Sequence, residues 1–171
     1  MSLAVFVLFF AVDGLNSFAS LLPGAPQLYP PQNSIRMLSG LGMGLVVAIY
    51  LFPAFNQTAW LEWDPRPAMD GWRSLAGLLL ATGLLGGLAL TESPVVLYPL
   101  ALISAGGVLA LLTMVYTVLG LTLMRRENRY QNFQQLVFPL AAGFGAALLQ
   151  IAAFDLVRFW LTGTWGGFQI G

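Results

Sequence analysis

Five long apolar stretches, separated by short polar segments, constrain this chain more than any other feature of its sequence. A helix that crosses a bilayer needs about 20 mostly apolar residues, because the hydrocarbon core is about 30 Å thick and each residue rises about 1.5 Å. The stretches cover residues 3–22, 35–55, 72–90, 95–124 and 134–161. Backbone in lipid must satisfy its own hydrogen bonds. We therefore expect an all-α fold, a polytopic helical bundle with about five transmembrane helices forming a single membrane domain over residues 1–171.

The composition supports a membrane protein and excludes several kinds of site. Hydrophobic residues make up 58% of the chain and charged residues 8%, whereas soluble domains have about 25% charged residues. Seven basic and seven acidic residues cancel, which argues against a nucleic-acid partner. The sequence has no cysteine and no histidine, so it cannot form disulfides, thiolate or imidazole metal sites, or a catalytic dyad built on histidine.

The segments between the stretches have the chemistry of helix ends. Residues 22–32 are too rich in proline for a helix, and Pro139 predicts a kink early in the fifth helix. Side chains that can cap a helix start precede three stretches: Asn33 or Ser34, Asp70, and Ser93 followed by Pro94. Interfacial aromatic residues lie at both ends of the helices, with Trp60, Trp63 and Trp72 at one end and Tyr29, Trp160 and Trp165 at the other.

The arginines predict an orientation. With five spans the connecting segments alternate sides, so one side receives five arginines and the other receives Arg36 and Arg158. The five are Arg66, Arg73, Arg125, Arg126 and Arg129. Because cytoplasmic loops carry the excess of basic residues, we expect an inner-membrane protein with its N-terminus inside and its C-terminus outside. The charge cluster at residues 125–129 then marks the cytoplasmic membrane surface, or else docks a peripheral partner.

A set of polar residues inside the apolar stretches forms the main candidate site: Asp13, Asn16, Arg36, Asp155 and Arg158. The first two are three residues apart on one helix face, as are the last two. Charges within a bilayer are costly and are usually paired. One interpretation is a buried cluster, joined by Gln150, in which Arg36 pairs with Asp13 and Arg158 with Asp155 around a cavity for a solute, a proton or a lipid headgroup. The other is that both arginines extend to headgroups and the acids fix helix packing.

Small residues four apart mark candidate packing faces. The pairs are Gly40 with Gly44, Gly83 with Gly87, and Ala142 with Ala146. Such spacing lets two helices approach closely in a membrane. The partner is another helix of this chain, another subunit, or a flat pigment or lipid tail.

The run Val12-Asp13-Gly14-Leu15-Asn16-Ser17 and the segments 28–40 and 52–56 resemble domain-of-unknown-function family 2085, a family of prokaryotic membrane proteins. The Asp-Gly of one helix, followed by Asn-x-x-Arg-x-x-x-Gly opening the next, carries the likeness. Segments 97–100 and 125–128 are similar to extended members from green filamentous phototrophic bacteria. Members carry a preceding segment with cysteine and histidine that this sequence lacks, so the chain looks like a shortened version. The resemblance implies a multi-pass prokaryotic membrane protein, a phototroph as its source, and no particular reaction.

These observations leave three functional hypotheses. We expect a non-enzymatic accessory or scaffold subunit of a larger membrane complex, photosynthetic or respiratory, whose partners are lipids and other integral membrane subunits. It has no cofactor of its own, and any carotenoid, quinone, lipid or chlorophyll that it contacts is held mainly by partners. The alternative is a small homo-oligomeric transporter or channel that uses the Asp/Arg cluster of the outer leaflet. A lipid-modifying enzyme ranks last, because no nucleophile, metal triad or close carboxylate pair is present.

Overall fold

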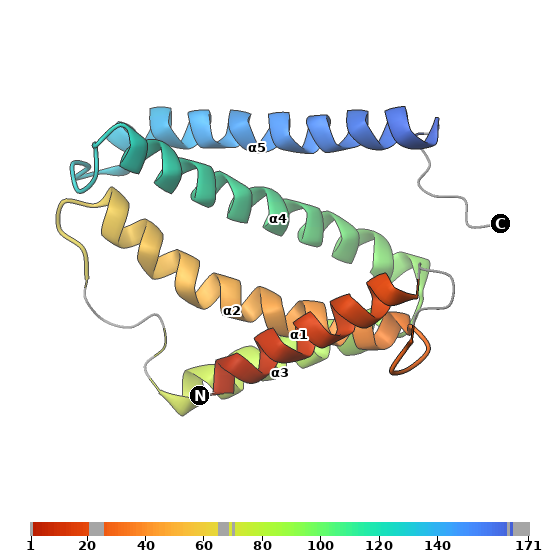
Figure 1. The fold of residues 1–171 in the computed structure, drawn as a ribbon. Coiled ribbons are helices and arrows are strands. Elements are labelled where there is room, and N and C mark those ends of the chain that lie inside the picture. The colour runs from red at the N-terminus through yellow and green to blue at the C-terminus, as the bar shows by residue number, and fades with distance from the viewer. Residues whose placement is uncertain (1, 21–25, 65–68, 70, 164, 166–171) are drawn as a thin grey trace. The chain divides into compact units, whose positions relative to one another are not determined.

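The computed structural model describes residues 2–20, 26–64, 69, 71–163 and 165 (Figure 1). In this part of the chain five α-helices follow one another and no β-strand is present. The helices are α1 (Ser2–Ala19), α2 (Asn33–Ala59), α3 (Trp72–Ala89), α4 (Pro94–Leu123) and α5 (Phe133–Thr162). The predicted all-α fold is therefore confirmed, and most helix ends lie within one or two residues of the predicted ones.

Local chemistry explains several helix ends. α4 begins at Pro94, directly after Ser93, where the missing N–H removes no helical hydrogen bond. The Asn132 side chain caps α5 by accepting from the Gln135 N–H at 3.1 Å. α2 begins at Asn33 and continues to Ala59, four residues beyond the predicted end. The N-cap of α3 is Gly71, with φ of 104°. The predicted cap Asp70 lies outside the described residues, as does the predicted end of the first helix at residue 22.

Four of the helices are long and apolar enough to cross a membrane: α2, α3, α4 and α5. α1 is a shorter apolar helix over Leu3–Ala19, which spans about 26 Å at 1.5 Å per residue. Large apolar side chains are exposed on all five helices; Leu15, Leu80 and Leu149 are each about 70% exposed. Such a surface suits a lipid environment and would promote aggregation in water.

The chain divides into two compact units, with boundaries inside α2, after Pro53, and inside α4, after Ile103. The first comprises Met1–Pro53 and Arg66–Ile103. In it α2 contacts α1 and α3 at glycines: a Cβ placed on Gly42 of α2 would lie 2.6 Å from the Phe6 ring of α1, and one on Gly86 of α3 would lie 3.1 Å from Leu41 of α2. These close approaches fix α1 and α3 against α2.

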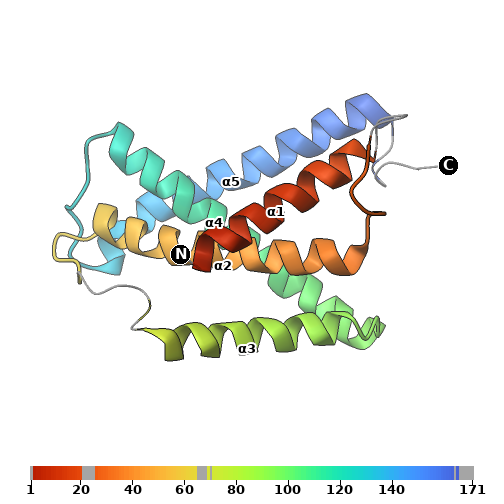
Figure 2. The same cartoon turned by 60° about the horizontal axis from the view of Figure 1, so that its bottom comes forward.

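The second unit comprises Ala54–Pro65 and Ser104–Gly171. α5 returns antiparallel to α4 after a short loop (Figures 1 and 2). Gly143 of α5 lies against α4, because a Cβ there would meet Thr113 O at 2.7 Å and Thr117 N at 3.0 Å. The apolar core of this unit consists of Phe55, Ala59, Leu121 and Leu136.

The end of α2 is joined to the α4–α5 loop by backbone hydrogen bonds, which we call the loop bridge. Asn128 N donates to Thr58 O at 2.8 Å and Tyr130 N donates to Ala59 O at 3.2 Å. Leu61 N then donates to Tyr130 O at 3.0 Å, which forms an isolated parallel β-bridge. The last four carbonyls of a helix lack partners within the helix. The loop bridge supplies partners for two of them in α2.

Candidate functional site

The candidate site of the first unit is a buried carboxylate held by two hydroxyl groups. Asp13 of α1 is 3% exposed. The Tyr29 hydroxyl donates to its Oδ1 at 2.6 Å, and the Ser39 hydroxyl of α2 donates to its Oδ2 at 2.8 Å. Both carboxylate oxygens therefore have a donor from outside their own helix. The arrangement joins α1, the following loop and α2 through a single side chain.

Asn16 lies one turn after Asp13 and is equally buried. Its Oδ1 accepts from Leu28 N at 2.7 Å, and its Nδ2 donates to Tyr29 O at 2.9 Å. One amide side chain thus satisfies a backbone donor and a backbone acceptor of the loop before α2. This contact places Tyr29 so that its hydroxyl reaches Asp13.

The hydrogen bond to Asp13 raises the pKa of the Tyr29 hydroxyl above its usual value, with smaller contributions from burial and from the Asp13 charge. A raised pKa keeps the phenol protonated, and so a donor, over the neutral pH range. The sequence predicts Tyr29 among the interfacial aromatic residues. In the structure its hydroxyl donates to the buried Asp13.

The predicted pairs of acids and arginines have different outcomes. Asp155 and Arg158 form an ion pair on α5, with Arg158 Nη2 3.1 Å from Asp155 Oδ1. Arg36 and Asp13, both described, do not form an ion pair within 4 Å, because the carboxylate is bound by hydroxyls. Arg36 is exposed at the start of α2, as an arginine that extends to headgroups would be.

The predicted cluster is also divided between the two compact units. Asp13, Asn16 and Arg36 belong to the first, and Asp155 and Arg158 to the second. Gln150, proposed as a link, accepts at its Oε1 from the Tyr116 hydroxyl at 2.8 Å, within the second unit. Side-chain exposure of 38% for Arg158 and 50% for Asp155 makes their pair a surface contact of α5.

The glycines expected to line helix contacts lie beside open space within this chain. A Cβ on Gly40, Gly44, Gly83 or Gly87 would meet nothing within 4 Å in the described structure. The close approaches occur instead at Gly42, which lies two residues from Gly40 and from Gly44, and at Gly86 and Gly143, which each lie one residue from a predicted position. Each residue turns the helix face by about 100°, so the spacing in the sequence did not identify the contact face. A role for the four open glycines with another subunit stays a prediction.

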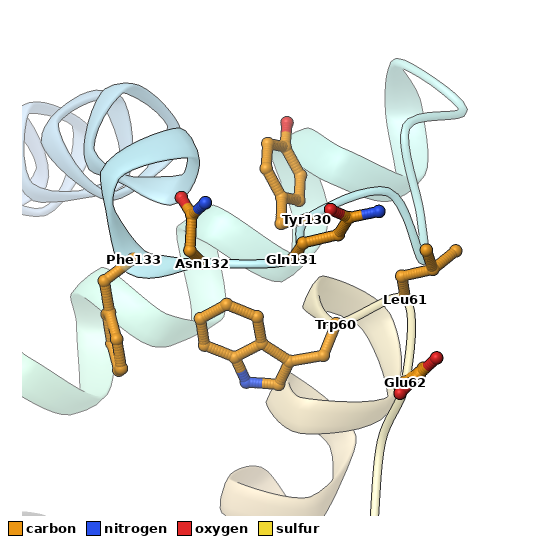
Figure 3. A pocket seen from close by; sticks show the side chains of 7 residues that line it. All are labelled: Trp60, Leu61, Glu62, Tyr130, Gln131, Asn132 and Phe133. Atoms are coloured by element: carbon orange, nitrogen blue, oxygen red, sulfur yellow. The ribbon is translucent and has the colours of Figure 1, made fainter.

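The exposed arginines Arg125, Arg126 and Arg129 lie in the loop between α4 and α5, which the loop bridge holds beside the end of α2. Arg66, assigned to the same side, lies outside the described residues. A cavity of about 680 Å³ is present here, lined by residues 60–62 and 130–133 (Figure 3). The Trp60 and Phe133 rings meet edge to face with centroids 5.0 Å apart, while the Tyr130 hydroxyl points away from them.

Comparison with known proteins identifies no relative of this chain. No family model, curated protein or solved structure matches the chain. The resemblance to domain-of-unknown-function family 2085 therefore stays a prediction from the motifs. Among the described residues no group of three or more acidic side chains is placed to hold a metal ion. The polar side chains of the site form hydrogen bonds that connect helices and loops of the chain.

Proposed function

We propose that this chain is a non-enzymatic accessory subunit of a larger membrane complex, and that it acts by packing against partner helices and lipids. The observation that carries the proposal is the exposure of its apolar helices. In α4 only Thr117 and Leu121 are buried, and in α3 only Gly86 is buried. These two helices have much more apolar surface than this chain covers, and the open glycines of α3 suit close contact with another helix.

The polar cluster supports a structural role for Asp13 and Asn16 of α1. Both oxygens of Asp13 and both ends of the Asn16 amide bind groups of the α1–α2 hairpin. A transport pathway would need polar groups that face a cavity and exchange partners with a solute. Asp13 and Asn16, the strongest candidates for such groups, instead bind residues of the loop before α2.

The proposal extends to location and partners. We place the chain in the inner membrane of a prokaryote with its N-terminus in the cytoplasm, following the arginine distribution. The complex is photosynthetic or respiratory, by the resemblance to proteins of phototrophic bacteria. Contact with carotenoid, quinone or chlorophyll occurs at surfaces shared with the subunits that hold those molecules.

Gentle detergent extraction, native electrophoresis and mass spectrometry of the comigrating chains test this function. We expect migration in a fixed ratio with other integral membrane subunits. Gly87→Leu should weaken that comigration, because the new side chain lies on a face of α3 where a Cβ meets nothing within 4 Å. Gly77→Leu is the matched control: it also meets nothing within 4 Å, but it lies on another face of the same helix.

Migration of the wild-type chain by itself, as a monomer or homo-oligomer, would contradict the accessory role. The alternative of a small transporter would then be tested by solute flux in vesicles with Asp13→Asn. A loss of flux in an assembly of unchanged size would support transport through the Asp13 and Arg36 region.

A further inference from the structure

A second cavity of the second unit combines a cationic side chain with an apolar floor. It has a volume of about 200 Å³ and lies between the end of α4 and the first turns of α5. Arg126 and Tyr130 come from the connecting loop, and Gln135 from the first turn of α5. The rest of the lining is apolar or small: Gly120, Leu121, Met124, Phe138, Pro139 and Ala142.

The chemistry of the lining changes along the helices. The polar residues are at the loop end, whereas Phe138 and Ala142 follow one and two turns further into α5. Leu121 similarly lies inside α4, before its end at Leu123. A ligand that fills this space therefore meets hydrogen-bond donors at the loop end and apolar side chains further along the helices. A phospholipid has the same arrangement, with a polar headgroup next to its acyl chains.

The donors are suited to an anion. No acidic side chain lines the cavity among the described residues, and the Arg126 guanidinium carries a permanent positive charge. The Tyr130 hydroxyl points away from Trp60, out of the neighbouring cavity of Figure 3. Gln135 accepts at its Oε1 from Gln131 N at 3.0 Å, which leaves its amide Nε2 as a donor.

The loop bridge holds the backbone of Tyr130 in place before any ligand binds. The N–H of Tyr130 is bound to Ala59 O and its carbonyl accepts from Leu61 N. Asn132 caps α5 and fixes the turn before Gln135. A site that is ordered in advance binds more tightly, because less conformational entropy is lost on binding.

We propose that this cavity is a binding site for an anionic phospholipid. Its phosphate accepts hydrogen bonds from Arg126, Tyr130 and Gln135, and the start of an acyl chain lies against Phe138 and Ala142. Guanidinium and phosphate form strong, charge-assisted hydrogen bonds. The site uses none of the residues of the Asp13 cluster, and the proposal stands whether or not the chain is an accessory subunit.

Native mass spectrometry of the purified protein tests the headgroup contact, with phosphatidylglycerol and phosphatidylcholine titrated in parallel. We expect the wild type to retain phosphatidylglycerol preferentially. Arg126→Gln should weaken this binding by about tenfold, the loss typical of one charged hydrogen bond. Arg129→Gln is the matched control, since it removes the same charge from the same loop but does not line the cavity. Equal losses in the two variants, or equal retention of the two lipids, would overturn the proposal.

A second pair of variants tests the acyl-chain contact without changing charge. Ala142→Phe places a ring in the cavity and should displace the lipid, while Ala141→Phe, on the neighbouring exposed face of α5, should leave it bound. Circular dichroism of both variants verifies that the helices form. Unchanged lipid retention in folded Ala142→Phe would show that the phospholipid does not occupy this space, as would displacement by inorganic phosphate alone at low millimolar concentration.

Discussion

Asp13 is a charged group placed in an apolar helix, and its environment consists of hydroxyl donors. Ion pairs in membrane helices have a partner that must also be removed from water, at further cost. Tyr29 and Ser39 satisfy the carboxylate without adding a second charge. Arg36 is thereby available to the membrane surface. The cluster thus holds α1, the following loop and α2 together through a single charged side chain.

Replacing Tyr29 with phenylalanine tests this contact and its pH dependence. Folding raises the pKa of the Tyr29 hydroxyl, so its contribution to stability is fully present below the unfolded-state pKa of about 10 and is lost as the pH rises through the higher folded-state pKa. We expect Tyr29→Phe to lower the unfolding midpoint at neutral pH and to remove part of the decline in strongly alkaline solution.

Tyr98→Phe is the control for this experiment, because Tyr98 is 71% exposed on α4. Unfolding in mixed micelles, followed by circular dichroism across the pH range, measures both variants. An unfolding midpoint in Tyr29→Phe equal to that of Tyr98→Phe at neutral pH would show that the hydroxyl contributes nothing to the hairpin.

How far the sequence predicts this cluster depends on the residue. The spacing of Asp13 and Asn16 correctly placed both on one buried face. Their partners could not be predicted, since the path of the proline-rich loop decides which group of residues 26–29 returns to α1. The ion pair of Asp155 with Arg158 was predictable because both residues lie on one helix, three positions apart.

At the level of helices, Gly143 of α5 packs closely against α4 in the second unit. Gly143→Ala would place a Cβ 2.7 Å from Thr113 O, which is closer than such atoms pack. We expect a loss of about 1 to 3 kcal/mol in the free energy of unfolding, as is usual for overpacking. Gly145→Ala meets nothing within 4 Å and should stabilise α5 by up to about 1 kcal/mol through helix propensity.

Chemical unfolding in mixed micelles distinguishes the two alanine variants. Because the substitution is identical and the sites are two residues apart, the difference reports the packing alone. If Gly143→Ala were as stable as Gly145→Ala, the close approach of α4 and α5 would be wrong.

The start of α5 depends on its cap. Asn132→Ala removes the acceptor for Gln135 N and should cost about 1 kcal/mol of stability, measured in the same unfolding assay. Asn132→Ser keeps a side-chain oxygen and should retain most of that stability. Equal losses in the two variants would contradict capping by this side chain.

The apolar stretches predicted the five helices well, because burial of backbone in lipid leaves helix as the available structure. The contact faces were less predictable. Gly143 and Ala147, both buried, form a small-residue pair that is shifted by one position from the predicted Ala142 and Ala146. The loop bridge had no sequence signal, since its hydrogen bonds join backbone groups that every residue carries.

For the whole molecule, the absence of cysteine in the sequence makes orientation directly measurable. A single introduced cysteine is the one thiol of the chain. With the N-terminus inside, we expect Glu92→Cys, between α3 and α4, to react with a membrane-impermeant maleimide added to intact cells. Glu127→Cys, between α4 and α5, should react only after the membrane is opened. The reverse pattern would invert the predicted orientation.

The loop bridge also sets an order of events during synthesis. Its two sides, residues 58–61 and 128–130, are separated in the chain by α3 and α4. The carbonyl groups at the end of α2 must therefore accept hydrogen bonds from water or lipid headgroups until α3 and α4 have been inserted. Until then the second unit lacks part of its core, because Leu136 has not been made. A chain whose synthesis stops after α4 would contain α1 to α4 but could not form the loop bridge, because residues 128–130 would be missing.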